Sequence, residues 1–328
     1  MTNQTTQTIA QATMPLVSFI ITTYNIPIEY LRACLQSIFA LSLAAGEREI
    51  IIIDDGSEQS PLKELETFRD EFIYVRQTNQ GVAVARNKGL SLAQGQYIQF
   101  IDGDDYLLTT PYEQGLDIAR FQHPDVVLFR FTTSGRAERA FAYKGPVTGS
   151  HYMKTHNLHA TVCGYLFHRS ILGNLRFTPG TVYGEDEEFT PQLILRAERL
   201  FSTESQAYYY RQHSESVLHR HAPEARQQRL SDNLRVLKHL RHLADTLPLV
   251  DREALQRRVA QMTMDYIYNS MIFSKNTSGV EQQIETLQKA GLFPLPERKY
   301  TRKYILFRKL TRTAGRRKVM KAVLSVIS

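Results

Sequence analysis

The chain lacks the cysteines and the long apolar runs that mark several classes of protein. It has two cysteines in 328 residues, Cys34 and Cys163, too few for a disulfide framework or a cysteine-paired zinc site. Both lie among apolar residues, so we expect buried, reduced thiols. No uninterrupted apolar run approaches the roughly 20 residues that a membrane-spanning helix needs. These absences predict a soluble, cytoplasmic protein.

Four sequence motifs of well-known enzyme classes are also missing. The chain has no Gly-x-x-x-x-Gly-Lys-Ser/Thr, no Gly-x-Gly-x-x-Gly, no His-Glu-x-x-His and no Gly-x-Ser-x-Gly. Their absence argues against P-loop nucleotidases, dinucleotide enzymes, zinc peptidases and serine hydrolases. Residues 1–13 have neither charge nor an apolar core, which predicts a flexible N-terminus and no signal peptide.

The charge is distributed unevenly along the chain. The net charge is +7, yet residues 298–328 alone hold 11 Lys and Arg residues and no Asp or Glu. The rest of the chain is therefore mildly acidic. Any affinity for a membrane or a polyanion is predicted to lie in this basic tail.

Strand-like and helix-like patterns alternate over the first 130 residues. Apolar, β-branched runs predict strands at residues 16–22, 49–53, 73–76, 96–101 and 125–131. Helical spacing or capping residues predict helices at residues 27–41, 60–72, 81–93 and 111–121. This order indicates an α/β fold with a mainly parallel sheet and right-handed crossovers.

Residues 132–159 break this pattern, and we expect loops there, with or without a hairpin, over an active-site cleft. A helix over 186–199 and a strand over 207–211 follow. After residue 223 only helical patterns remain, at residues 230–247, 252–272, 280–290 and 300–326, the last with one glycine interruption. We therefore divide the chain into a flexible N-terminus (1–13), a catalytic domain (14–221) and a helical region with the basic tail (222–328).

Carboxylates follow two of the predicted strands and precede one helix. They are Asp54, Asp55, Asp102, Asp104, Asp105, Glu185 and Asp186. Open α/β sheets bind ligands at the carboxyl ends of their strands. Several carboxylates at one edge repel each other unless a cation joins them, and Mg²⁺ and Mn²⁺ prefer oxygen ligands. The pattern predicts a divalent metal that holds a phosphorylated substrate.

Each cluster also has a simpler interpretation as local structure. Asp54 and Asp55 suit a tight turn, and acids at residues 185–188 suit the N-terminus of a helix. The alternative functions are a base or ribose contact for Asp54 and general-base catalysis for Asp186. His213 is either a metal or phosphate ligand or a structural histidine.

Polar residues at the end of the first strand and in one helix are further candidates. Thr22, Tyr24 and Asn25 can bind or stack on a base, or Asn25 simply caps the next helix. Arg86 stands among small residues, where it meets either a negative group or solvent.

Taken in order, these segments resemble glycosyltransferase family 2 enzymes of the GT-A fold. The matching pieces are residues 17–25, 53–57, 79–81, 85–90, 100–105, 184–189 and 210–213. The resemblance covers residues 15–217 and leaves the last hundred residues outside it. It implies a Rossmann-like sheet between helices and inverting transfer of a sugar from a nucleotide sugar.

The resemblance also implies roles for the candidate residues. Thr22, Tyr24, Asp54 and Arg86 match positions that hold the base of the nucleotide, usually uracil. Asp186 matches the catalytic base. Asn25, Asp55 and Glu185 remain secondary candidates.

The acidic loop at residues 102–105 matches the ribose and metal positions of the family. Asp102 or Asp104 corresponds to the ribose contact, and Asp104 and Asp105 to metal ligands, with His213 as a further candidate. The implied cofactor is Mn²⁺ or Mg²⁺. How the family divides these roles among Asp102, Asp104 and Asp105 varies.

The expected partners are a nucleotide-sugar donor, with UDP as the nucleotide, and a glycan or lipid-linked acceptor of cell-surface polysaccharide synthesis. The basic tail is predicted either to touch the anionic inner face of a membrane or to dock on the catalytic domain. Nucleic acid is not an expected partner, since no recognition motif accompanies the basic residues. The alternative functions are a nucleotidyltransferase acting on sugar phosphates and a non-catalytic nucleotide-sugar binding module.

Overall fold

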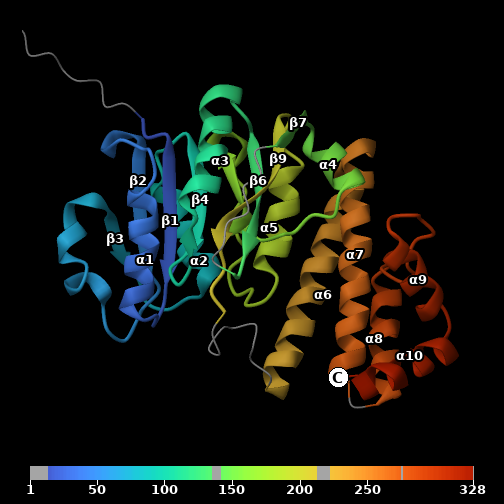
Figure 1. Cartoon of the computed structure of the whole chain (residues 1–328). Helices are drawn as coiled ribbons and strands as arrows, with labels where there is room; N and C mark the ends of the chain where they lie inside the picture. Colours follow the sequence, from blue (N-terminus) through green and yellow to red (C-terminus); the bar gives the residue numbers. More distant parts are fainter. Residues whose placement is uncertain (1–13, 135–141, 213–221, 275, 328) are drawn as a thin grey trace, which may run out of the picture.

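A computed structural model describes residues 14–134, 142–212, 222–274 and 276–327, and its centre is one curled sheet (Figure 1). In the described part this sheet has nine strands, in the order β3-β2-β1-β4-β8-β6-β9-β5, with β7 also paired to β9. The strands are β1 (Val17–Thr23), β2 (Arg48–Asp54), β3 (Ile73–Arg76), β4 (Tyr97–Asp102), β5 (Tyr106–Leu107), β6 (Val126–Thr132), β7 (Tyr143–Val147), β8 (Tyr165–His168) and β9 (Leu200–Tyr209).

Most strands of the sheet point the same way, which confirms the predicted fold class. β1 is parallel to β2 and β4, and β2 is parallel to β3. β8 runs antiparallel to both β4 and β6, so β6 and its parallel neighbour β9 share the direction of β4. Only β5, β7 and β8 of the described strands run the opposite way. The buried β-branched residues of β1 and β2 suit strands that are covered on both faces.

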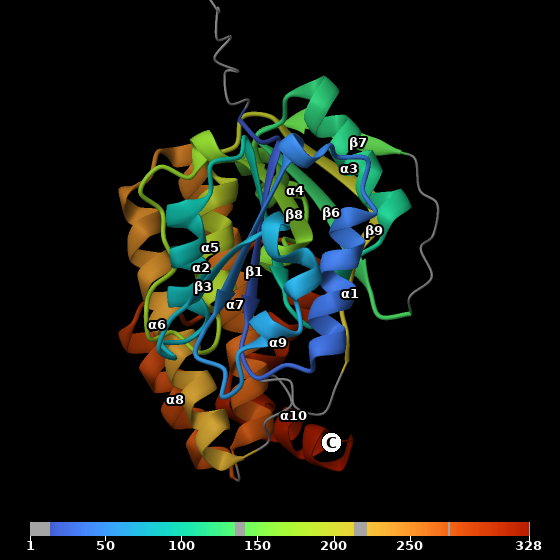
Figure 2. The same cartoon turned by 90° about the vertical axis from the view of Figure 1, so that its left-hand side faces the viewer.

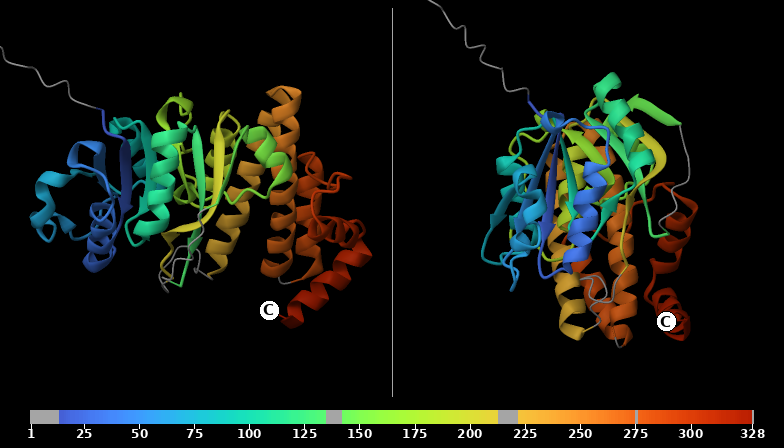
Figure 3. Two further views of the ribbon diagram at one scale, coloured as in Figure 1. Left: turned by 45° about the horizontal axis from the view of Figure 1, so that its top comes forward. Right: turned by 60° about the vertical axis from the view of Figure 1, so that its left-hand side comes forward.

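Helices cover both faces of the sheet and form a separate layer at its side. Figure 2 shows α1 and α3 on one side of β1, and α2 and α5 on the other. Figure 3 shows α8, α9 and α10 beyond α7, on the side away from the sheet. The helices are α1 (Ile28–Phe39), α2 (Val82–Leu92), α3 (Thr109–Gln122), α4 (Gly149–Thr155), α5 (Glu185–Ile194), α6 (Pro223–Thr246), α7 (Leu249–Phe273), α8 (Thr277–Lys289), α9 (Arg302–Thr311) and α10 (Ala314–Ile327).

Several predicted elements differ from the structure. The strand predicted at residues 207–211 is longer and begins earlier, as β9, and the helix predicted at residues 186–199 ends at Ile194, as α5. Residues 60–72 form two short 3₁₀ helices, Pro61–Lys63 and Glu66–Glu71, because Leu65 is the one side chain of this segment that the core fully encloses. Residues 132–159 contain β7, which pairs with β9, and α4. The tail helix breaks between α9 and α10 at residues 312–313, before Gly315, where Arg317 donates to the carbonyl of Thr311.

Some predictions concern residues outside the described ranges. The N-terminus at residues 1–13 and the domain boundary expected near residue 221 both fall there. Cys34 and Cys163 lie inside the described ranges. Both thiols are buried and free, as predicted.

The small residues of α2 let this helix pack closely on the sheet. A Cβ atom added to Gly89 would lie 2.2 Å from Cγ2 of Ile20, a buried and stiff side chain of β1. We expect Gly89→Ala to destabilise the fold by about 1–3 kcal/mol, because the helix must move away from the strand. Gly115→Ala in α3 is the control, since its Cβ would have no heavy atom within 4 Å. Urea unfolding of both variants measures the difference, and equal stabilities would contradict this packing.

Candidate active site

The register of the sheet brings the ends of three strands together. Thr22 lies opposite Asp102 in the pair β1–β4, and Thr23 lies opposite Asp54 in the pair β1–β2. The hydroxyl of Thr22 is 3.5 Å from Oδ1 of Asp102. The carboxylates that follow β2 and β4 therefore meet at one edge of the sheet, as the sequence predicted.

Arg86 lies at the centre of a cluster of three carboxylates. Its guanidinium nitrogens are 2.6 Å from Asp186, 3.0 Å from Asp102 and 3.1 Å from Glu185. Arg86 is only 3% exposed, and its guanidinium also lies over the ring of Phe177. The alternative of a solvent-facing arginine is thus wrong. Its predicted contact with a nucleotide base stays a prediction.

Local backbone structure positions Asp186 in this cluster. Gly184 has a φ of +85°, a left-handed conformation that favours glycine, and α5 begins directly after it. Asp186 thus lies in the first turn of α5, where the helix dipole favours a negative charge. Its Oδ2 accepts a hydrogen bond from the backbone N–H of Val162 at 3.2 Å. Both oxygens of Asp186 are therefore held in fixed directions.

Burial changes the proton affinity of both acids at the start of α5. It raises the pKa of Asp186 to about 6, although Arg86 opposes the rise. It raises the pKa of Glu185 to about 7, and the neighbouring Asp186 charge adds to the rise. A general base works best with a pKa near the operating pH. Asp186 is therefore suited to accept a proton close to neutral pH.

The acidic loop after β4 contains carboxylates with different environments. Asp105 is 1% exposed, and it accepts hydrogen bonds from the hydroxyl of Tyr208 at 2.7 Å and the backbone N–H of Arg211 at 2.8 Å. Burial, together with the charges of Asp102 and Asp104, raises the pKa of Asp105 to about 8. Asp104 is half-buried. Asp105 thus joins this loop to the end of β9, and its role as a metal ligand stays a prediction.

Arg211 completes this joint between the loop and β9. Its Nε donates to the carbonyl of Asp104 at 2.8 Å, and its guanidinium stacks 4.0 Å from the ring centre of Tyr30. Arg211 lies in a segment that matches the family, but it was not among the candidate site residues. The signal available in the sequence was its position at the end of the tyrosine-rich strand predicted at residues 207–211.

The carboxylates after β2 also have specific partners. Asp54 is fully buried, accepts from the hydroxyl of Tyr74 at 2.6 Å and lies 3.5 Å from Nε of Arg76. Asp55 accepts from the backbone N–H groups of Gln80 at 3.0 Å and Gly81 at 2.8 Å. Asp55 therefore fixes the loop that leads into α2, the helix that carries Arg86.

Tyr24 and Asn25 lie just beyond β1. Tyr24 is 48% exposed, so its ring is available for stacking. Asn25 has a φ of +49°, and its side chain accepts from the N–H of Glu58 at 2.8 Å. Asn25 therefore connects two loops at the sheet edge, and its predicted cap on the following helix is wrong, since Pro27 precedes α1. Nucleotide contacts of Thr22, Tyr24 and Asp54 stay predictions.

The oxygen donors at this edge are of the type that a magnesium or manganese ion uses, and metal binding stays a prediction. Such an ion binds to one or two carboxylates and takes its other ligands from substrate phosphates and water. Of the predicted ligands, Asp104 is half-buried at the sheet edge, and Asp105 is enclosed by its protein partners. Among the described residues, no group of three or more His, Cys, Asp or Glu side chains could hold a metal by itself. His213 lies outside the described residues.

Two ion pairs attach α5 to the helical layer. Glu187 pairs with Arg258 of α7, and Glu188 pairs with His239 of α6. The hydrogen bond that His239 donates to Glu188 raises the pKa of His239. Burial opposes any fall in the pKa of Glu188, but this bond and other polar contacts outweigh it and lower that pKa. The helix that presents Asp186 is thus held from both sides, by the sheet and by the helical layer.

This pair predicts a pH dependence of stability. The raised pKa of His239 stabilises the fold below its ordinary value of 6.5, and the gain disappears as the pH rises through the raised value. The lowered pKa of Glu188 stabilises the fold above pH 4.5, the ordinary pKa of a glutamate, and this gain is lost as the pH falls through the lowered value. We expect the melting temperature to fall above about pH 6.5 in the native protein and to fall less in His239→Gln. The control is His242→Gln, an exposed histidine of the same helix; equal pH profiles of all three proteins would contradict this contribution.

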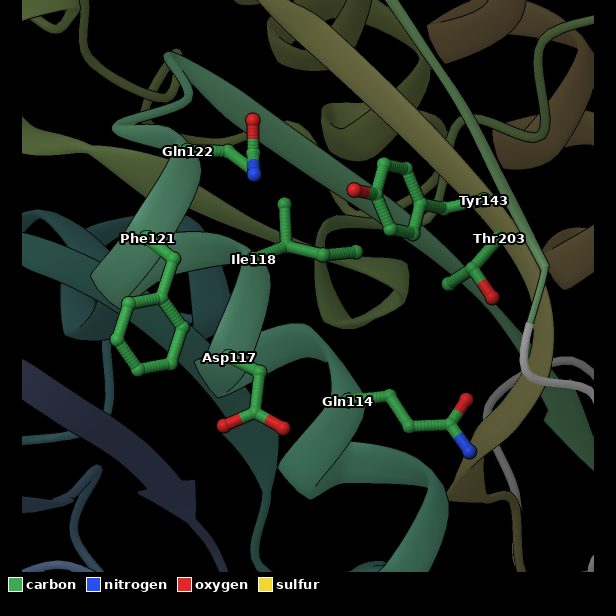
Figure 4. A pocket seen from close by; sticks show the side chains of 7 residues that line it. All are labelled: Gln114, Asp117, Ile118, Phe121, Gln122, Tyr143 and Thr203. Atoms are coloured by element: carbon green, nitrogen blue, oxygen red, sulfur yellow. The ribbon is translucent and has the colours of Figure 1, made fainter.

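A separate surface hollow of about 230 Å³ lies along α3 (Figure 4). Its lining consists of Gln114, Asp117, Ile118, Phe121, Gln122, Tyr143 and Thr203. None of these residues belongs to the Arg86 cluster. The carboxylate site is therefore distinct from this hollow.

The fold and the site define a class: an α/β protein of the GT-A type whose acidic residues gather at the carboxyl edge of its sheet. The family model "Glycosyl transferase family 2" matches residues 18–175. Together with the relatives below, this match assigns residues 18–175, just under half of the chain, to glycosyltransferase family 2.

Among curated relatives, the chain is 29% identical over 222 residues to the uncharacterized glycosyltransferase EpsJ of Bacillus subtilis, covering 62% of this chain and 63% of that protein. It is 29% identical over 225 residues to the uncharacterized glycosyltransferase YibD of Escherichia coli, covering 62% of this chain and 64% of that protein. The similarity thus spans less than two thirds of these relatives.

The solved structures extend the likeness in fold to the helical region. Residues 1–349 of TarS from Staphylococcus aureus superpose with a TM-score of 0.68 at 20% identity, covering 93% of this chain and 88% of that one. A mannosyltransferase from Pyrobaculum calidifontis, in complex with GDP-Man and Mn²⁺, gives a TM-score of 0.55 at 15% identity. The superposition covers 94% of this chain and 87% of that one. At these identities the likeness concerns the fold alone.

Proposed function

We propose that this chain transfers a sugar from a nucleotide-diphosphate donor to a hydroxyl of a glycan or lipid-linked acceptor, with inversion at the anomeric carbon. The observation that carries the proposal is the position of Asp186, held by Arg86 and Val162 beside Asp102. This position joins a candidate base to the sheet edge where a nucleotide is expected to bind. The predicted class is a metal-dependent hexosyltransferase.

In the proposed reaction, Asp186 accepts the proton of the acceptor hydroxyl. The acceptor oxygen then forms a bond to the anomeric carbon as the bond from that carbon to the diphosphate oxygen breaks, and the nucleotide diphosphate leaves. Attack from the side opposite the leaving group inverts the anomeric centre. Such general-base assistance contributes typically about 10²–10⁴-fold to the rate.

A uridine diphosphate is the proposed donor nucleotide. A TarS structure in complex with UDP-GlcNAc has a TM-score of 0.53 to this chain, and the predicted base contacts Thr22, Tyr24 and Asp54 lie at the same edge as Asp102. When bound, Mg²⁺ or Mn²⁺ would neutralise the charge that develops on the departing diphosphate. Asp104 is the proposed carboxylate ligand, with Asp102 at the ribose.

Cell-surface polysaccharide synthesis is the proposed setting. The relatives include the minor teichoic acid biosynthesis protein GgaB of Bacillus subtilis and the poly(ribitol-phosphate) β-N-acetylglucosaminyltransferase TarS. No helix in the ranges described above is long and apolar enough to cross a membrane.

The test is a donor screen with the purified protein. UDP-glucose, UDP-galactose, UDP-GlcNAc and GDP-mannose are incubated with it in Mn²⁺, and the release of nucleoside diphosphate is measured. We expect release from one UDP-sugar, and we expect Asp104→Ala to abolish the Mn²⁺-dependent thermal shift by UDP. Glu58→Ala, an exposed acid of a neighbouring loop, is the matched control. Stabilisation by a donor without release would indicate a binding module, and pyrophosphate formation from UTP and a sugar phosphate would indicate a nucleotidyltransferase.

A further inference from the structure

We propose that the outer face of α9 and α10 binds the surface of an anionic lipid bilayer. We call this surface the tail face. Its apolar members are Leu306 and Leu310 of α9, and Val319 and Val323 of α10, which are 59%, 39%, 65% and 53% exposed. In each helix the two side chains are four residues apart, so they share one face of that helix.

The opposite face of both helices already has a structural role. Tyr304 and Phe307 are buried, and Arg317 pairs with Glu281 of α8. Lys321 donates to the backbone carbonyls of Met271 and Ser274 at the end of α7. These contacts place the tail on α7 and α8 of the helical layer, whereas the predicted docking was on the catalytic domain. They use the inner face of the tail and leave the tail face exposed, so docking and membrane contact are compatible.

Basic side chains surround the exposed aliphatic ones. Arg302, Lys303 and Lys309 of α9 and Arg316 and Lys318 of α10 are all exposed. Residues 298–328 contain no Asp or Glu, so within the tail no carboxylate offsets this charge. A surface of this sign is complementary to anionic lipid headgroups, to which each Lys or Arg is attracted independently of its neighbours.

The combination of charge and exposed aliphatic groups favours a bilayer over a soluble polyanion. A polyphosphate or a nucleic acid neutralises Lys and Arg but gains little from Leu and Val at the surface. An interfacial helix uses both, since its apolar side chains enter the boundary between headgroups and acyl chains. Figure 3 shows α10 on the far side of the helical layer from the sheet, so the proposed contact is not made by the strands that carry the carboxylates.

The experiment is co-sedimentation of the full chain with lipid vesicles, without donor or acceptor, so its result is independent of the proposed reaction. We expect binding to vesicles of phosphatidylcholine with phosphatidylglycerol, and none to phosphatidylcholine alone. The triple variant Arg302→Gln, Lys303→Gln, Lys309→Gln is expected to bind more than a hundredfold more weakly, at about fivefold for each charge removed. Leu306→Ser with Val319→Ser is expected to lose about tenfold.

Matched controls separate the tail face from general surface effects. The charge control removes three exposed charges from the catalytic domain by the substitutions Lys63→Gln, Arg69→Gln and Lys88→Gln. The aliphatic control removes two exposed side chains at the start of α7 by Leu249→Ser and Val250→Ser. Both controls are expected to bind vesicles as the native chain does. Circular dichroism and thermal melting verify that every variant is folded.

Three results would overturn the proposal. The first is equal vesicle binding by the native chain and the triple charge variant. The second is binding to polyphosphate or single-stranded DNA without binding to anionic vesicles, which would assign the tail face to a soluble polyanion. The third is a dimer in sedimentation equilibrium that Leu306→Ser with Val319→Ser dissociates, again without vesicle binding, which would assign the tail face to a second copy of the chain.

Discussion

Asp186→Asn is expected to lower the rate of sugar transfer by about 10²–10⁴-fold while the donor binds with nearly unchanged affinity. The amide keeps the size of the side chain but cannot accept the proton of the acceptor hydroxyl. Arg86 retains two carboxylate partners, Asp102 and Glu185, so the site is expected to stay folded. We therefore expect a lower turnover rate and an unchanged dissociation constant of the nucleotide.

The measurement is transfer activity, with calorimetric titration of the nucleotide in Mn²⁺ on the same preparations. Glu187→Gln is the matched control, because it makes the same chemical change one residue further on and contacts Arg258 instead of Arg86. Near-native turnover of Asp186→Asn would remove this residue from the role of base. An equal loss in Glu187→Gln would show that the start of α5 is simply sensitive to charge.

Arg86→Met is expected to destabilise the protein by about 3–5 kcal/mol, because it leaves three carboxylates near each other without their cation. For a domain of this size that corresponds to a fall in melting temperature of about 10 °C. The loss should be larger at pH 8 than at pH 5. A carboxylate whose pKa is raised in the folded state stabilises it at low pH, and this gain disappears as the pH rises through the raised value. Burial already raises the pKa of Glu185 to about 7 and of Asp186 to about 6, and removal of Arg86 raises both further.

Urea unfolding at the two pH values measures this effect. Arg120→Met is the control, since Arg120 pairs with a partly exposed Glu47 at 3.4 Å, an ion pair of a kind that contributes about 0–1 kcal/mol. A loss below 1 kcal/mol in Arg86→Met, or a loss independent of pH, would contradict the central position of Arg86 among these acids.

Much of the catalytic domain was predictable because its signals are local. Strands such as β1 and β2 contain runs of apolar, β-branched residues, and α1 repeats its apolar residues at helical spacing. The convergence of Asp54 and Asp102 was also predictable, since parallel strands end at the same edge. The 3₁₀ segments at residues 61–71 were not. Ser60 does cap the first of them, but Leu65 is the one fully buried side chain of this stretch, too little packing to stabilise a longer α-helix.

The acidic residues look alike in the sequence, and only their partners in the structure distinguish their roles. Asp55 holds the loop before α2, Asp105 binds Tyr208 and Arg211, and Asp186 faces Arg86. Each of these contacts joins residues that are far apart in the chain, so no local pattern of the sequence contains them. Burial, which determines the direction of their pKa shifts, is likewise a property of the packed molecule.

The amino-acid sequence by itself determined the layered α/β fold, the edge of the sheet where the acids gather and the family that the order of segments resembles. These properties follow from periodicity, strand direction and chain order. Only the tertiary structure decided that Arg86 joins Asp102 to Asp186, a hundred residues further along than Arg86, and that Asp105 is enclosed by protein groups. The physical reason is that an ion pair requires closeness in space, and packing of α2 and α5 on the same face of the sheet creates that closeness.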